Sequence, residues 1–245
     1  MKFLRPILLA LATLFTVVPA VAQNHVIKIT PGKLLGPVNN LQLGYEGVVS
    51  EKVTLGVDLK IAFPSSATDI PFDLDTLAVG ESGTFETFGL SSGWSVTPQV
   101  RFYLGKSGAP KGFYLNPWLR FFRYSLDSEV VWTEPAGDSD IDAQFTYGGF
   151  GGGFNIGWQW FLGDAFVIDW NFGLGALPTR LGISGSVTGP LADDVQEFID
   201  EVNNQLDEAP LISGQFEGDA GSLQGNTNYF IMPVFRSNLS IGYAF

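Results

Sequence analysis

Catalysis or metal binding in this chain would have to rest on a single histidine and on clustered carboxylates. His25 is the one histidine, and there is no cysteine, which excludes a thiol nucleophile, a disulfide and a thiolate metal ligand. A histidine acts as a general base only beside a group that it can hydrogen-bond. His25 lies close to the N-terminus, far from the long loops that could build such a site. We therefore predict no catalytic residue, no cofactor and no metal ligand, and hence no enzyme.

Two short motifs resemble ligand sites without completing them. Asp138, Asp140 and Asp142 match the first half of an EF-hand calcium loop, but Ala143 and Gly149 stand where glycine and a bidentate glutamate are needed. Loose binding of divalent cations remains an alternative to a solvated acidic loop. The glycine-rich run 148–153 precedes no helix, which favours close packing within a strand over a nucleotide-binding loop.

A third set of candidate functional residues consists of charged residues at alternating positions of apolar segments. Alternation places five bases and three acids on one inner face: Lys28, Lys60, Arg101, Arg120, Arg236, Glu46, Asp58 and Asp169. Unpaired charges in a narrow interior are costly, so we expect a linked network completed by polar neighbours. These neighbours are Tyr103, Tyr114, Asn116 and Asn155. The network is either a plug that closes a barrel or, because bases are in excess, a narrow conduit or anion site.

Eight extended segments must position these side chains. Their predicted ranges are 25–35, 40–49, 52–63, 93–104, 112–124, 144–161, 165–177 and 229–245. In the third segment Val53, Leu55, Val57, Leu59, Ile61 and Phe63 share one face. Short connections at 50–51, 105–111 and 163–164 alternate with long, acidic ones at 64–92, 125–143 and 178–228, a pattern typical of bacterial outer-membrane barrels.

Composition agrees with a membrane barrel. Aromatics reach 14% and charged residues only 16%, yet no stretch after the first 22 residues is long and apolar enough for a transmembrane helix. The predicted fold is all-β, an eight-stranded antiparallel transmembrane up-and-down β-barrel. A secreted β-sandwich is the alternative. The last long loop should carry a short amphipathic helix at about 191–206, which packs on the barrel mouth or docks a partner protein.

The N-terminal segment predicts secretion. Lys2 and Arg5 precede an apolar run, and Ala20 and Ala22 fit a cleavage site, so we interpret residues 1–22 as a signal peptide and residues 23–245 as the barrel domain. Removing the two bases changes the net charge from −12 to −14. Such a charge repels phosphate backbones, and we expect no nucleic-acid partner.

The final strand carries the resemblance to a known family. Leu239, Ile241, Tyr243 and Phe245 alternate up to a terminal aromatic residue, and this ending resembles the closing strand that the barrel-assembly machinery reads. The whole chain is similar to the small outer-membrane barrels of the OmpA transmembrane-domain and OmpX type, and less so to OmpW. The resemblance implies an outer-membrane location and contact with outer-membrane lipid and lipopolysaccharide. It also implies a structural or surface-interaction role, with a partner protein at the outer loops. A channel or small-ligand conduit is the first alternative, and a lipid-modifying enzyme is the second.

Overall fold

The computed structural model describes residues 24–31, 40–73, 82–134, 137–189, 199–200, 203–204, 214–219 and 221–245. Within these ranges the chain forms eleven β-strands. They are β1 (His25–Ile29), β2 (Asn40–Ser50), β3 (Val53–Ala62), β4 (Ser65–Asp73), β5 (Ser82–Tyr103), β6 (Gly112–Glu134), β7 (Gly137–Leu162), β8 (Phe166–Thr188), β9 (Gly214–Asp219), β10 (Ser222–Thr227) and β11 (Phe230–Ala244).

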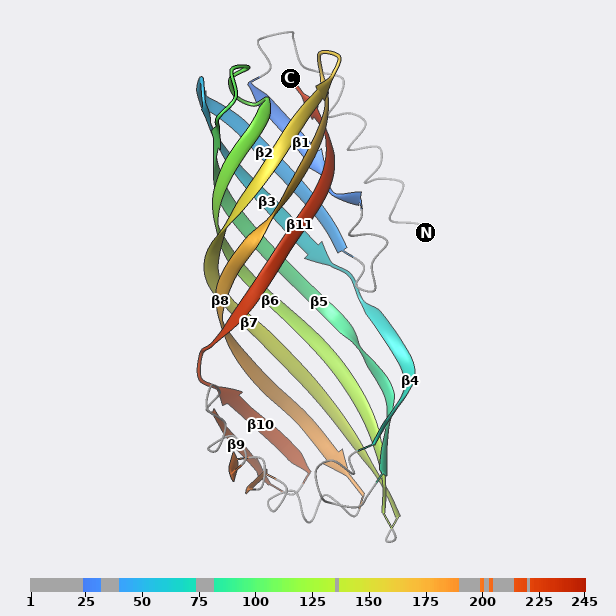
Figure 1. The fold of residues 1–245 in the computed structure, drawn as a ribbon. Coiled ribbons are helices and arrows are strands. Elements are labelled where there is room, and N and C mark those ends of the chain that lie inside the picture. Colours follow the sequence, from blue (N-terminus) through green and yellow to red (C-terminus); the bar gives the residue numbers. More distant parts are fainter. Residues whose placement is uncertain are drawn as a thin grey trace.

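Eight of these strands close into a ring (Figure 1). Antiparallel pairs run in the order β1, β2, β3, β5, β6, β7, β8, and β11 closes the circle by pairing with both β8 and β1. Phe245 completes the seam, because its backbone N–H donates to the His25 carbonyl at 2.9 Å and its carbonyl accepts from His25 at 3.0 Å. The predicted all-β fold with eight ring strands is confirmed.

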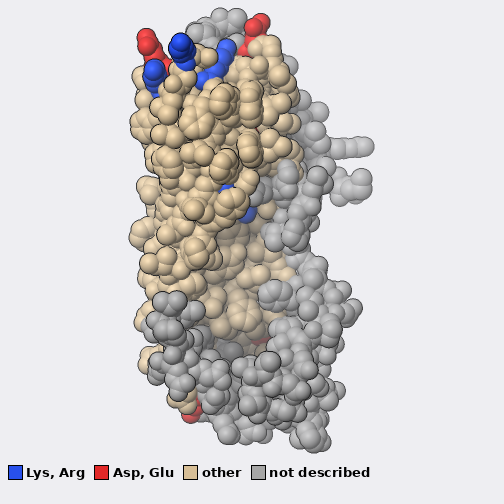
Figure 2. Space-filling model, viewed as in Figure 1, with Lys and Arg blue, Asp and Glu red and all other residues tan. Residues whose placement is uncertain are grey.

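Alternation along the strands separates an apolar outer face from a polar inner face. On β7, for example, Phe150, Phe154 and Trp158 are exposed, whereas Asn155 and Gln159 are buried. The same division holds on β3, β8 and β11, so large apolar side chains form a belt around the ring. Figure 2 shows this belt as an almost entirely uncharged band below an end where Lys, Arg, Asp and Glu gather. No helix among the described residues is long and apolar enough to cross a membrane.

Strands replace much of what the sequence predicts as long loops, and those loop predictions are wrong there. Residues 125–134 continue β6 and 137–143 belong to β7, in an unbroken ladder from Gly112↔Gln159 to Glu134↔Gly137. β4 and the first part of β5 occupy the segment 64–92, while β9 and β10 form a hairpin beside β8. Beyond the apolar belt an outward side chain needs no apolar character, so a polar, acidic sequence can continue a ladder into water.

Two predictions fall largely on residues that the structure does not describe. The signal peptide, residues 1–22, lies wholly outside the described residues. Of the predicted helix at 191–206, only residues 199–200 and 203–204 are described, and their backbone is helical.

Candidate functional site

The interior of the ring holds a four-charge cluster near the end where the short turns lie. Lys28 Nζ is 2.5 Å from Glu46 Oε2 and 2.9 Å from Asp169 Oδ2, and Arg101 Nη1 is 3.1 and 2.9 Å from the same two atoms. All four side chains are at most 4% exposed. Because each base contacts both acids, the cluster is neutral and each charge has two partners, which offsets the cost of burial.

Neutral polar side chains complete this cluster. The Tyr103 hydroxyl donates to Glu46 at 2.6 Å, and the Tyr114 hydroxyl donates to Asp169 at 2.5 Å. Thr54 also donates to Glu46, and the Gln159 carbonyl accepts from both bases. The Gln159 amide then donates to the Pro110 carbonyl in the β5–β6 turn at 2.8 Å. Seven of the eight ring strands contribute side chains, so the cluster reaches across the lumen.

A second layer is built around Asp58. Its carboxylate accepts from Arg236 at 2.5 Å and from Gln99 at 3.0 Å. Side-chain amides continue the layer, since Asn155 donates to Asn171 at 2.9 Å and accepts from the Trp118 indole N–H at 2.8 Å. This layer links β11, the last strand of the chain, to β3 and β5 on the other side of the ring.

Lys60 and Arg120 lie in the same region with weaker partners. Arg120 Nε donates to Thr97 at 3.1 Å, and its guanidinium carbon is 5.3 Å from the Trp118 ring. Lys60 Nζ is 5.3 Å from the centre of the Tyr124 ring. Among the described residues neither base has a carboxylate within ion-pair distance. Of the three described bases in this region only Arg236 pairs with a carboxylate, that of Asp58, so this half of the lumen carries a positive excess.

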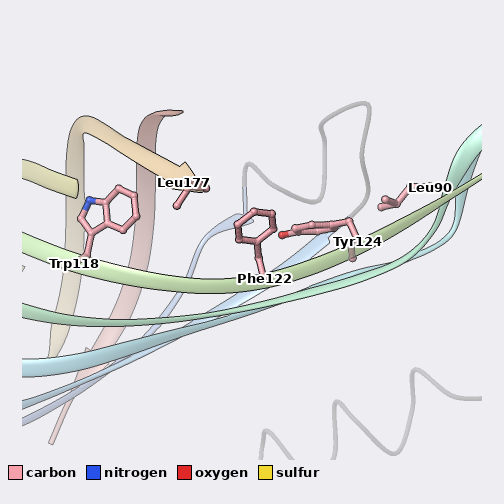
Figure 3. Close-up of a cluster of buried hydrophobic side chains, with 6 residues drawn as sticks. Leu90, Trp118, Phe122, Tyr124 and Leu177 are labelled. Carbon is pink, nitrogen blue, oxygen red and sulfur yellow. The ribbon is translucent and has the colours of Figure 1, made fainter. Parts of the chain in front are cut away.

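An apolar cluster lies beside these bases and extends toward the far ends of the long strands (Figure 3). Trp118, Phe122 and Tyr124 project from one side of β6, while Leu90 and Leu177 come from β5 and β8. Tyr147 stacks on Tyr124 with ring centres 5.2 Å apart. These residues are not among the candidate residues predicted from the sequence. Their inward direction does follow from the sequence, because Arg120 is predicted to face inward and even-numbered neighbours on the same strand must share its face.

Glycines on the inner wall make room for the large side chains. A β-carbon on Gly157 would lie 2.5 Å from the Tyr114 ring, and one on Gly153 would lie 2.5 Å from the Trp118 ring. Both distances are too short for carbon atoms. These close approaches explain why glycines alternate with bulky outward residues along β7, and they agree with the close packing predicted for the run 148–153.

The remaining candidate residues lie elsewhere. His25 Nδ1 is 2.7 Å from the Tyr45 hydroxyl, and its ring stacks on Phe245 at the seam. Asp140 and Asp142 are exposed on the extended strand β7, which does not wrap oxygen ligands around a cation as a loop does. Leu239, Ile241 and Tyr243 point outward on β11.

Comparisons with known proteins find a likeness among solved structures. No protein-family model matches the chain, and no curated protein matches it. Among solved structures, the crystal structure of the outer membrane protease OmpT from Escherichia coli shares 8% identity, and the match covers 90% of this chain and 92% of that chain with a TM-score of 0.39. The ring described above rests on the strand pairing of this chain, and a likeness of this degree says nothing about function.

Proposed function

We propose that the protein is an integral outer-membrane β-barrel with a structural or surface-interaction role. The closed ring supports this proposal, because its outside is an apolar belt and its inside is polar and ion-paired. A water-soluble protein has the reverse arrangement, with apolar side chains inside, so a ring with an apolar outside and a polar inside fits a lipid environment. The eight-strand count also fits the resemblance to the OmpA and OmpX type of barrel.

Heat modifiability tests the barrel and its location together. Outer-membrane fractions would be run on a gel with and without boiling, since a closed barrel resists detergent until it is heated. We expect the protein in the outer-membrane fraction, with a migration shift on boiling. Recovery as a soluble periplasmic protein without a shift would instead support the secreted β-sandwich.

The four-charge cluster supports a barrel that does not conduct. Side chains from seven ring strands meet there, and each is hydrogen-bonded across the lumen, so an ion would have to break several buried ion pairs to pass. We expect no current through the barrel in planar bilayers.

A contact surface for a partner protein lies at the far ends of β6 and β7. It consists of acidic outward side chains, among them Asp127, Glu129, Asp140 and Asp142.

A conduit or anion site is the second candidate function, and one observation favours it. Among the described residues Lys60 and Arg120 have no ion-paired carboxylate, Arg236 pairs with Asp58, and Arg236 Nη1 has no hydrogen-bond partner. A small anion would relieve this imbalance. Discrete, reproducible channel openings with anion selectivity would replace the closed-plug proposal with this one.

A lipid-modifying enzyme is the least supported alternative. His25 is held between Tyr45 and Phe245 at the seam, at the end of the ring opposite the protruding ends of β5 to β8. Purified barrel incubated with labelled outer-membrane lipid should leave the lipid unchanged, and a time-dependent product would establish the enzyme.

A further inference from the structure

Two arginines stand on the outer face of the barrel in one row of paired residues. Trp94 pairs with Arg123, Arg123 with Gly148, and Gly148 with Arg180, on β5, β6, β7 and β8. Tyr229 stands beside Arg180, directly before the first residue of β11, which pairs with Thr179. We call these five residues the interface row. Gly148 has no side chain, and the other four side chains are all exposed.

The interface row marks the edge of the apolar belt. On β6, Phe121 precedes Arg123 by two residues on the same face, and Ser125 follows it by two. On β8, Pro178 and Gly182 stand in the same positions relative to Arg180. Thus each strand changes from apolar to polar at this row. Tryptophan and tyrosine at the two ends of the row suit a membrane–water boundary, where aromatic rings of barrels gather. Lipid phosphates lie at the same level.

A cavity of about 1170 Å³ opens at the row, and all five of its residues line it. Gly148 leaves the surface between the arginines without a side chain, and their α-carbons are separated by two strand spacings, or roughly 10 Å. Arg180 Nε donates to the Thr227 carbonyl at 3.2 Å, which holds the guanidinium against the sheet. The exposed carboxylate of Glu217 also lines the cavity, so the balance of the three charges is +1.

We propose that the cavity at the interface row binds the phosphate groups of a phosphorylated outer-leaflet lipid, with Arg123 and Arg180 as the contacts. Guanidinium groups pair with phosphate through two parallel hydrogen bonds. The apolar belt beneath the row accommodates the acyl chains, and the two aromatic residues flank the headgroup. The two exposed arginines stand at the edge of the apolar belt, where such a headgroup would meet the protein. This inference rests on the proposed membrane location.

Lipid retention by purified barrel tests the site. The probe is diphosphorylated lipid A, compared with chemically dephosphorylated lipid A, and bound lipid is counted by native mass spectrometry. The test variant is Arg123→Gln/Arg180→Gln. Its matched control is Lys52→Gln/Lys106→Gln, which removes the same charge from exposed positions at the other end of the ring. All proteins are first checked for the heat-induced migration shift.

The arginine variant should retain about tenfold less diphosphorylated lipid than wild type, because it loses the charge-assisted hydrogen bonds of two guanidinium groups. Wild type and control should not differ, and all should retain the dephosphorylated lipid equally weakly. The single variant Arg123→Gln should lose part of the binding. Equal retention by folded wild type and double variant would overturn the site. Displacement by millimolar inorganic phosphate would assign it to free anion instead. Wild type without a heat shift would count against the proposed function itself.

Discussion

Glu46 is the residue on which the inner network depends most. Its carboxylate accepts from Lys28, Arg101, Tyr103 and Thr54, and it is 1% exposed. The alternation of strand residues predicts that it faces inward, but not which bases it meets. Pairing follows from the register of β1, β2 and β5, and register is a property of the closed ring.

Replacing Glu46 with glutamine should destabilise the barrel. Lys28 and Arg101 would then share the one remaining carboxylate, that of Asp169, in a buried site. Removing one partner of a buried ion pair typically lowers the free energy of unfolding by about 3–5 kcal/mol. The midpoint of urea unfolding in detergent or lipid measures the loss. Glu51→Gln is the matched control at an exposed turn and should leave the midpoint unchanged. Equal midpoints for Glu46→Gln and wild type would show that the network contributes no stability.

Gly157 is a second residue with a sharp structural requirement. Gly157→Val would push against the Tyr114 ring and the Asn171 β-carbon, so it should lower stability by about 1–3 kcal/mol and disturb the bond from Tyr114 to Asp169. The temperature of the gel-shift transition reports the change. Gly105→Ala offers the comparison, because its nearest neighbours would be 3.9 Å away. A valine variant as heat-resistant as wild type would mean that the inner wall is looser than the structure shows.

At the scale of elements, the sequence predicts the belt well and the ends poorly. Val53–Phe63 alternates so regularly that β3 follows from the pattern alone. The segment 125–143 carries acids, which suggests a loop, yet residues 125–134 extend β6 and residues 137–143 extend β7, because the ladder hydrogen bonds continue regardless of outward side chains. Trp118 and Phe122 show a further limit. Their inward direction follows from alternation, but their gathering with Leu177 into one cluster depends on neighbouring strands.

The outer half of the β6–β7 hairpin should be dispensable for folding. Asp127 pairs with Gln144, whose amide donates to it at 2.9 Å, so an Asn-Gly turn could replace residues 128–143. The shortened chain keeps the whole apolar belt and should still show the heat shift in the outer membrane. Failure of this variant to form a barrel would show that the protruding strands nucleate the ring.

The last strand carries a separate prediction about assembly. Phe245 contributes backbone bonds to the seam, which alanine retains, and its ring only stacks on His25. If the aromatic end is an assembly signal, Phe245→Ala should reduce the folded protein in cells severalfold while purified protein refolds in detergent as readily as wild type. Leu162→Ala, outside the last strand, controls for lost apolar surface. A defect of equal size in both settings would make the role of Phe245 structural.

At the scale of the whole molecule, the account depends on closure between the first and last strands. Ile29 and Ile241 are paired across the seam of β1 and β11. The two residues are 212 positions apart in the sequence. Because the chain has no cysteine, cysteines introduced at these positions report on this contact alone.

The most direct measurement is oxidative crosslinking of Ile29→Cys/Ile241→Cys in isolated outer membranes. Ile29→Cys/Leu59→Cys is the matched control, because Leu59 lies on β3, two strands away from β1. The account predicts an efficient intramolecular disulfide in the first variant, in protein that still shows the heat shift, and none in the control. Absence of the crosslink in membrane-embedded protein, or equal crosslinking in both variants, would contradict the closed eight-stranded barrel.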